Sequence, residues 1–261
     1  HRSSPVPYAE RFTQQSAVAA YESEEYASGS YSSSIWQLQQ PRLKEIISRF
    51  KTGAHHPVRL LDFACGSGRI LSFVEGLVDT AEGVDISTSM SEAAQQRCMS
   101  ATIRVGDILK EPGLLQPPYD IITSFRFLLN VENPIRRSAL HRLREVIRTP
   151  GGLLLVNVHG NSRSLRHPAI AWKRWRMRHA SATANSELML NEMSPLDAKR
   201  LLSESGFEVV QMLGFGLAPP TLYRTPIRNM AAALDSFFAN RGWLAEQSVD
   251  LLFVCRPRMT T

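Results

Sequence analysis

The chain has few cysteines and no long apolar run. Its three cysteines, Cys65, Cys98 and Cys255, are widely separated and odd in number, which argues against a disulfide framework or a zinc site. The apolar runs have the length of strands and fall well short of the roughly 20 residues that span a membrane. No charged and then apolar leader opens the chain. We therefore expect a cytoplasmic protein with no metal and no transmembrane segment.

Two nucleotide-binding motifs are also missing. A dinucleotide fingerprint needs a third glycine three positions after Gly68, where this chain has Leu71. No Gly-Lys-Ser/Thr sequence is present either, which excludes a phosphate-cradling loop of that type. These absences argue against recognition of a pyrophosphate.

A strand, a glycine turn and a helix are nevertheless expected in succession. Val58–Phe63 is a short apolar run suited to a strand buried on both faces. Gly66 and Gly68 then permit a tight turn with a close backbone approach to a ligand, and helical spacing resumes at Arg69. Asp62 lies near the end of the strand, where it can organise the turn or reach an amino group of a ligand. This succession predicts a nucleotide-type pocket.

Acidic residues end the next two expected strands. Ala81–Val84 leads into Asp85, where a carboxylate can accept two hydrogen bonds from vicinal ribose hydroxyls, and Ser87 is suited to cap the following helix. Thr102–Val105 leads to Asp107, which can receive an adenine amino group. Taken singly, each acid is equally typical of a turn or a helix cap. Their order along alternating strands is what indicates a nucleoside site.

Strands and helices continue to alternate to the end of the chain. With 261 residues and 43% hydrophobic composition, the chain can bury the core of one α/β domain. The patterns predict strands at Tyr119–Phe125, after the Pro150 turn to Val158, at Phe207–Leu213 and at Val249–Cys255, and helices at Pro134–Arg148, Pro195–Ser205 and Pro226–Asn240.

This ordered set resembles the class I S-adenosylmethionine-dependent methyltransferases, closely over Leu60–Val158 and more loosely from Ser34 to the end. The resemblance implies an α/β fold of the Rossmann-like type: a doubly wound, seven-stranded, mostly parallel sheet whose last strand inserts antiparallel between the fifth and sixth. It also implies S-adenosyl-L-methionine as the cofactor. The residues assigned to cofactor binding are Asp62, Ala64, Gly66, Gly68, Asp85, Ile86, Asp107, Ile108 and Phe125. Ala64 departs from the pattern, because a glycine is usual there and alanine restricts positive φ.

An N-terminal arm, residues 1–33, is expected before the domain at 34–261. Aromatic residues recur there at every fifth position: Tyr21, Tyr26, Tyr31 and Trp36. This period fits neither a helix nor a strand, so we expect no regular core element in the arm. Members of the family often fold such an arm over the cofactor as a lid, which would bring Tyr26 and Tyr31 to it. The alternative is that the aromatics only anchor the arm to the domain surface.

A basic insertion, residues 161–190, is expected after the fifth strand at the cofactor-facing edge of the sheet. No Asp or Glu occurs from Val146 to Ser186, whereas Arg and Lys accumulate there beside Trp residues. The Arg and Lys side chains account for most of the formal net charge of +6. The residues that we expect to bind the acceptor are Arg126, Arg163, Arg174 and Arg176. Such a surface suits an anionic saccharide, a nucleic acid or an anionic membrane. The alternative is a solvated helix face whose tryptophans pack inward.

Three residues at the ends of the fourth and fifth strands are candidates for catalysis. His159 is placed to accept a proton from a hydroxyl or an ammonium acceptor, and Asn130 and Glu132 to orient that acceptor. The alternative for His159 is a turn histidine whose nitrogens bond to the backbone.

The sequence thus predicts methyl transfer from S-adenosyl-L-methionine to a hydroxyl, or to an amine, of a small molecule or saccharide, with an acidic sugar of glycan biosynthesis favoured. Nucleic acid is disfavoured, because Phe125–Asn130 lacks the Asn-Pro-Pro-Tyr type of motif that related enzymes use for a flipped base. Two other classes stay open. One is a methyltransferase-like scaffold without turnover; the other is an NAD-dependent oxidoreductase, disfavoured by Leu71.

Overall fold

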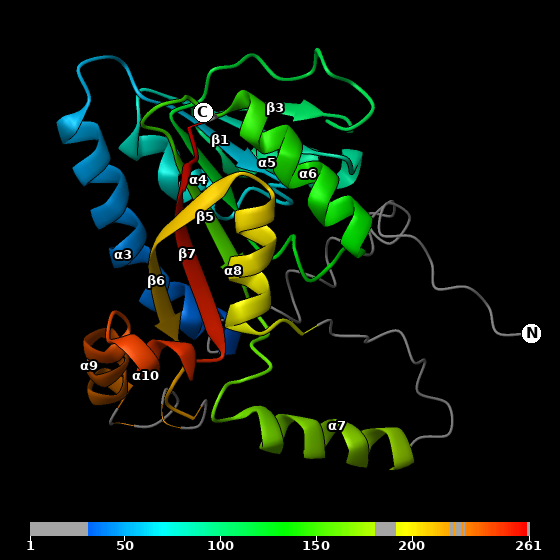
Figure 1. Cartoon of the computed structure of the whole chain (residues 1–261), viewed down its shortest axis with the longest axis vertical. Coiled ribbons are helices and arrows are strands. Elements are labelled where there is room, and N and C mark those ends of the chain that lie inside the picture. Colours follow the sequence, from blue (N-terminus) through cyan, green and yellow to red (C-terminus); the bar gives the residue numbers. More distant parts are fainter. Residues whose placement is uncertain (1–30, 181–191, 220–221, 223–225, 227, 260–261) are drawn as a thin grey trace, which may run out of the picture.

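A computed structural model describes residues 31–180, 192–219, 222, 226 and 228–259. It consists of one twisted sheet with helices on both faces and further helices at one end (Figure 1). In the described part of the chain, no helix is both long and apolar enough to cross a membrane.

The sheet has seven strands in the order β3-β2-β1-β4-β5-β7-β6. Six of them run in one direction, and β7 is antiparallel to both of its neighbours, β5 and β6. The predicted topology is therefore confirmed, including the position of the antiparallel strand. The strands are β1 Arg59–Phe63, β2 Thr80–Asp85, β3 Thr102–Val105, β4 Ile121–Ser124, β5 Leu153–Val158, β6 Phe207–Phe215 and β7 Asp250–Pro257.

The central strands are mostly apolar and almost entirely buried, because both faces of the sheet are covered. All six residues of β5 are buried. Leu154 packs into one hydrophobic core and its neighbour Leu155 into the other, as expected from the alternation of side chains along a strand. Continuous apolar runs were therefore a reliable strand signal here.

Different helices cover the two faces of the sheet. Side chains from α3, α4 and α5 belong to one core, and side chains from α6 and α8 to the other. The helices are α3 Tyr31–Gly53, α4 Leu71–Val74 with the 3-10 turn η2 Glu75–Leu77, α5 Thr88–Arg97, α6 Asn133–Val146, α7 His167–Ala180, α8 Pro195–Glu204, α9 Arg228–Phe238 and α10 Gly242–Glu246.

Two predicted helix starts are confirmed by their caps. The Ser87 hydroxyl accepts a hydrogen bond from Met90 N (3.3 Å) at the start of α5, and the Ser194 hydroxyl accepts one from Asp197 N (3.1 Å) at the start of α8. Two predicted helix ends are wrong by two residues, since α9 ends at Phe238 rather than Asn240 and α6 also ends early. Helix α6 ends at Val146 rather than Arg148, because Arg148 N donates to the carbonyl oxygen of Tyr119 and thereby joins the sheet.

The expectation of no regular element around the aromatic residues is wrong for residues 31–36. Tyr31 begins the 23-residue helix α3, so the predicted boundary between residues 33 and 34 falls inside this helix. The buried stripe of α3 repeats every fourth residue, at Ile35, Gln39, Leu43 and Ile47, which is helical spacing. The every-fifth aromatic pattern concealed that stripe. Residues 1–30, including Tyr21 and Tyr26, lie outside the described residues.

All six parallel strands end at the same edge of the sheet, and β7 begins there. At this edge two residues other than glycine have a left-handed backbone: Ala64 after β1, with φ 55°, and Arg126 after β4, with φ 59°. Such conformations cost an L-residue about 1–2 kcal/mol and occur most often at functional sites. The carboxyl edge of the sheet is therefore the place to look for a site.

Replacing Ala64 by glycine should stabilise the protein by about 0.5–1 kcal/mol, because glycine adopts a positive φ without strain and this gain exceeds the added freedom of the unfolded chain. Denaturant unfolding of the ligand-free protein measures the change. Ala101→Gly is the matched control, since Ala101 has no positive φ, and it should lower stability. A loss of stability in Ala64→Gly would contradict strain at this position.

Candidate functional site

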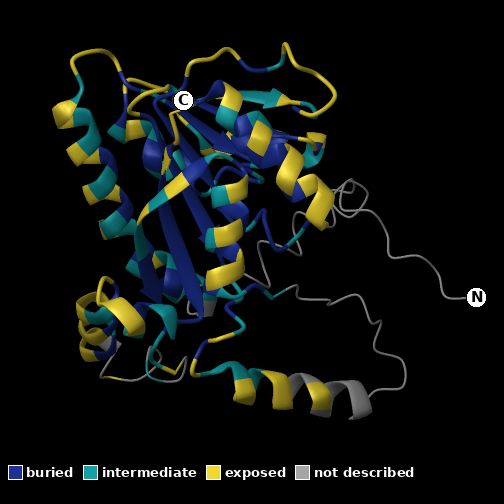
Figure 2. Cartoon of the chain, viewed as in Figure 1, coloured by how far each residue is buried: buried dark blue, intermediate teal, exposed yellow. Residues whose placement is uncertain are grey.

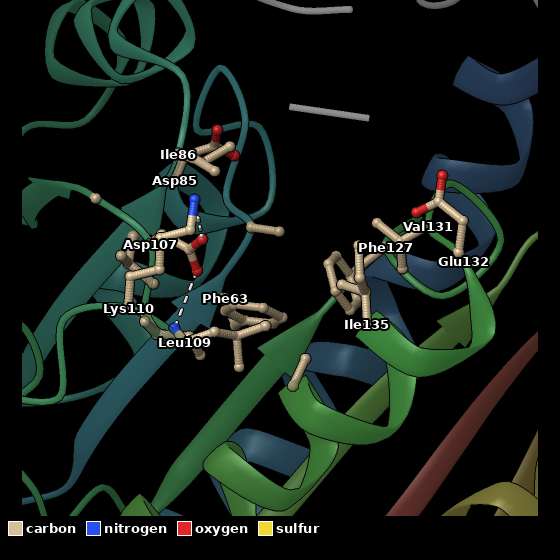
Figure 3. A pocket seen from close by; sticks show the side chains of 15 residues that line it. Phe63, Asp85, Ile86, Asp107, Leu109, Lys110, Phe127, Val131, Glu132 and Ile135 are labelled. Carbon is tan, nitrogen blue, oxygen red and sulfur yellow. Dashed lines mark hydrogen bonds and ion pairs between the residues drawn. The ribbon is translucent and has the colours of Figure 1, made fainter. Parts of the chain in front are cut away.

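The carboxyl edge contains a cavity of about 330 Å³ between the ends of β1, β2, β3 and the start of α6. One wall comes from the β2 and β3 ends and the facing wall from the segment after β4, with Phe63 between them (Figure 3). The lining residues are Phe63, Ala64, Val84, Asp85, Ile86, Gly106, Asp107, Ile108, Leu109, Lys110, Phe127, Val131, Glu132, Ile135 and Ala139.

Asp85 fixes the shape of this cavity. Its Oδ2 accepts a hydrogen bond from Gly66 N (2.8 Å) and its Oδ1 accepts one from Ser87 N (2.9 Å). The carboxylate therefore joins the glycine turn after β1 to the start of α5. Burial raises its pKa, and each oxygen keeps a further lone pair for a ligand.

Asp107 occupies the same wall. Its Oδ1 accepts a hydrogen bond from Leu109 N (2.9 Å), while Lys110 Nζ lies 3.6 Å from Oδ2. Ile86, which is 38% exposed, adds an apolar surface beside it. The sequence-predicted residues Asp85, Ile86, Asp107 and Ile108 thus line one cavity.

The facing wall is mostly apolar, and apart from Glu132 the sequence analysis missed it. Phe63 and Phe127 meet edge to face, with ring centroids 4.7 Å apart, and Val131 and Ile135 continue this surface. Phe127 and Val131 lie in the irregular segment after β4, where no sequence periodicity marked them. The space between this wall and Ile86 is bounded by apolar side chains, which suits an aromatic base.

A second, smaller cavity of about 50 Å³ shares Ala64 with the first. Its lining includes Asp62, Gly66, Arg69, Phe125 and Arg126. The two cavities therefore meet at the residue that carries the strained backbone after β1.

Asp62 is the buried acid of the smaller cavity. Its Oδ1 accepts a hydrogen bond from the Thr123 hydroxyl (2.6 Å), but its Oδ2 is buried without a hydrogen-bond partner. Burial raises the pKa of Asp62 to about 7. An acceptor of this kind would be satisfied by an ammonium group. An apolar cavity with two carboxylates beside a small cavity with an unsatisfied acceptor fits a nucleoside linked to an amino acid.

Gly68, which the sequence analysis assigned to the cofactor, lines neither cavity. A side chain at Gly68 would lie 3.0 Å from Ala94 and 3.1 Å from Cys98 Sγ, and its φ is +78°. The glycine is needed for the turn and for packing against α5.

A polar cluster lies at the end of β5. Asp250 Oδ1 accepts hydrogen bonds from Gln39 Nε2 (2.7 Å) and Asn157 Nδ2 (2.5 Å), and burial raises the pKa of Asp250 to about 7. His159 Nδ1 is buried without a hydrogen-bond partner. Burial, with a contribution from the charge of Arg126, holds the pKa of His159 well below its usual value. Sequence reasoning found His159 but missed Gln39 and Asp250, which are distant in the chain.

The two other catalytic candidates, Asn130 and Glu132, have different surroundings. Asn130 Nδ2 donates a hydrogen bond to the carbonyl oxygen of Arg126 (2.6 Å), so it supports the left-handed turn at the small cavity. Glu132 is exposed and lines the larger cavity opposite Asp85 (Figure 3). The structure therefore brings Glu132 to the cavity with the two carboxylates rather than to His159.

The remaining predicted residues are dispersed. Phe125 lines the small cavity and meets Trp36 edge to face, with centroids 6.3 Å apart. Arg163 lines a separate cavity with α8 and α10. Arg174 and Arg176 lie on α7, but their side chains, like that of Tyr31, are outside the described part. Trp172 and Trp175 are 59% and 56% exposed, so the tryptophans of α7 do not pack inward.

Comparison with known proteins points to one family. A family model described as a methyltransferase domain matches residues 35–212. A curated relative, dTDP-4-amino-2,3,4,6-tetradeoxy-D-glucose N,N-dimethyltransferase of Saccharopolyspora spinosa, is 28% identical over 115 residues, which cover 43% of this chain and 45% of that enzyme. The match thus spans less than half of this relative's length.

Solved structures share the fold over most of the chain. DhpI in complex with S-adenosylhomocysteine has a TM-score of 0.61 and 15% identity, covering 98% of this chain and 100% of DhpI. Magnesium protoporphyrin IX methyltransferase of Synechocystis, with bound S-adenosylmethionine, has a TM-score of 0.53 and 12% identity, covering 94% and 97%. The [4+2]-cyclase SpnF has a TM-score of 0.51 and 16% identity, covering 84% and 82%. At these identities the likeness shows the fold alone.

The family match covers most of the strands that form the two cavities, and the cavities have the chemistry that the cofactor of this family requires. The chain belongs to the methyltransferase domain family, and solved neighbours of its fold contain S-adenosylmethionine or S-adenosylhomocysteine.

Proposed function

We propose that the enzyme methylates a hydroxyl or an amine of a polar small molecule, with a saccharide as the favoured acceptor. The observation that carries the proposal is His159 at the end of β5, whose Nδ1 is buried and has no hydrogen-bond partner. A buried nitrogen of this kind costs stability unless a ligand satisfies it. A hydroxyl or amine acceptor would do so.

His159 has the protonation state that a base requires. Because burial and Arg126 depress its pKa, the imidazole is neutral at neutral pH. A neutral imidazole can accept the proton that an oxygen or nitrogen acceptor loses during methylation. Asn130 would act indirectly, by holding the Arg126 turn beside it.

The cofactor would be held by the two adjoining cavities. Asp85 would bind the ribose hydroxyls, and Asp107 with the backbone of Ile108 the adenine edge. The base itself would lie between Ile86 and the Phe63–Phe127 pair. Asp62 Oδ2 would accept from the ammonium of the methionine part. When bound, S-adenosylmethionine supplies a methyl group on an activated sulfonium, so the protein's main task is to position the acceptor and exclude water.

The charges near His159 favour a polar acceptor. Arg126 offers a cation to a carboxylate or phosphate of the acceptor, and Asp250 offers a buried carboxylate to an amine or hydroxyl. The relative from Saccharopolyspora spinosa is named for methylating the amine of a nucleotide-linked sugar, which supports a saccharide acceptor. Glu132 would not orient the acceptor, since it lines the larger cavity, which would hold the nucleoside of the cofactor.

The acceptor class can be tested with nucleotide sugars that differ at one position. We expect the protein to release S-adenosylhomocysteine from S-adenosylmethionine when given a dTDP-deoxysugar with an amino or a hydroxyl group at C4. A C4-deoxy analogue, which has no group to methylate, is the control. Turnover with DNA or RNA oligonucleotides but with no sugar would contradict the proposal.

Replacing Asp85 by alanine should weaken S-adenosylhomocysteine binding by about 2–3 kcal/mol, because a charge-assisted contact to ribose is removed and the glycine turn loses its anchor. Isothermal calorimetry on the folded variant measures the change. Asp79→Ala is the matched control, since Asp79 also accepts a backbone hydrogen bond, from Val58 N (2.7 Å), but lies outside both cavities. Equal affinity of Asp85→Ala and the wild type would refute a role of Asp85 in holding the ribose.

Replacing His159 by alanine should lower kcat by about 10²–10⁴, the usual contribution of a general base, and leave S-adenosylhomocysteine affinity unchanged. Wild-type activity should fall when the imidazole gains a proton with falling pH. Because the pKa of His159 is lowered, this loss should occur at a pH below the ordinary histidine range. This acid limb should be absent in the variant. His141→Ala is the control, because His141 is exposed on α6. A decrease of less than about fivefold would show that His159 is no base.

A further inference from the structure

Helix α9 exposes an apolar face to solvent. Met230, Ala233, Leu234 and Phe237 are spaced at i, i+3, i+4 and i+7, so they form one stripe along the helix. All four are exposed, and the three large side chains keep 57%, 49% and 52% of their surface accessible. A surface helix normally turns such a stripe toward the core.

The opposite face of α9 attaches it to the protein. Ala231 and Asp235 are buried there, and Asp235 Oδ1 accepts hydrogen bonds from Leu217 N (3.0 Å) and Ala218 N (3.3 Å). Gly214 N of β6 also donates to the carbonyl oxygen of Ala239 (2.8 Å). These contacts fix the rotation of the helix, so its apolar stripe stays on the outside.

Helix α10, which follows α9 after three residues, adds a further exposed aromatic side chain. Trp243 is 68% exposed, and the Arg241 guanidinium lies over the Phe237 ring, 3.6 Å from its centroid. We call Met230, Ala233, Leu234, Phe237 and Trp243 the apolar patch. The two acidic residues of α9 and α10 do not offset the positive charge of Arg241, because Asp235 is buried and Glu246 pairs with Lys199 (2.7 Å).

The apolar patch belongs to the end of the molecule that carries the site. Helix α9 follows β6 and α10 precedes β7, so both connect strands at the carboxyl edge, where Asp250 and His159 lie. Helix α7 lies at the same end (Figure 1), and several of its described residues are exposed (Figure 2). Trp172 and Trp175 of α7 are more than half exposed, and residues 146–186 contain no acid.

We propose that the apolar patch docks the enzyme on an anionic lipid surface, with the carboxyl edge of the sheet facing the membrane. Exposed Met, Leu, Phe and Trp beside arginines are the composition of helices that lie in a membrane interface, where Arg241 would reach the headgroups. A second copy of the chain is the less suitable partner, because pairing patch to patch would bury the Arg241 cations of both copies while the acids of α9 and α10 are already buried or paired. Docking would present the acceptor site to substrates held at the membrane.

Vesicle sedimentation tests the proposal without an acceptor. The full chain should sediment with vesicles of equal parts phosphatidylcholine and phosphatidylglycerol, and much less with pure phosphatidylcholine. The triple variant M230S/L234S/F237S should bind at least about tenfold more weakly, since it removes most of the inserting apolar surface. M99S/V210S is the matched control, because Met99 and Val210 are 96% and 46% exposed outside the patch, and it should bind like the wild type.

The outcomes separate docking from the proposed acceptor chemistry. Unchanged S-adenosylhomocysteine affinity of the triple variant shows that it is folded, since the patch is outside both cavities. Absence of wild-type binding to the mixed vesicles, or equal binding by the triple variant, overturns the proposal. A dimeric wild type with a monomeric triple variant in size-exclusion chromatography would instead make the patch a subunit interface and also overturn it.

Discussion

The carboxylate of Asp85 is the interaction on which the site depends. It accepts backbone hydrogen bonds from Gly66 on one side and Ser87 on the other, and so joins the ends of two neighbouring parallel strands. This contact places the glycine turn between the larger and the smaller cavity, which meet at Ala64. The left-handed backbone of Ala64 is the local strain that such a close turn requires. A structural anchor and a cavity-lining carboxylate are here the same group.

The carboxyl edge also concentrates buried polar groups that the fold itself does not satisfy. Asp62 Oδ2 and His159 Nδ1 have no hydrogen-bond partner, and the pKa values of Asp62 and Asp250 rise to about 7 through burial. Each group lowers the stability of the folded protein. Their concentration beside two cavities is expected of a site in which ligands supply the missing partners. The opposite edge shows a contrast, because Asp120 there accepts hydrogen bonds from Arg59 N and His56 and pairs with Arg148, and its pKa is lowered.

The acceptor site and the apolar patch are carried by connections at the same edge of the sheet. The six parallel strands deliver every one of these connections to one end, so the insertion with α7 and the segment with α9 and α10 border the same region (Figure 1). Topology thus brings the proposed acceptor site and the proposed docking surface to one end of the sheet, although different residues form them. The two cavities are formed at the ends of β1 to β4 and at α6, and no residue of either segment lines them.

The sequence by itself determined where most strands lie, the glycine turn, the capped helices and the acids at the strand ends, whereas the strand order was implied only by the resemblance to the methyltransferases. It did so because buried parallel strands are continuous apolar runs, and turns and caps are local chemistry. Tertiary structure alone decided the rest. Gln39 and Asp250 are 211 residues apart yet share a hydrogen bond, and Phe63 meets Phe127 only because β1 pairs with β4. The apolar stripe of α9 is visible in the sequence, but its outward orientation is set by the buried contacts of Asp235. Periodicity gives a helix its two faces, and only packing decides which of them faces inward.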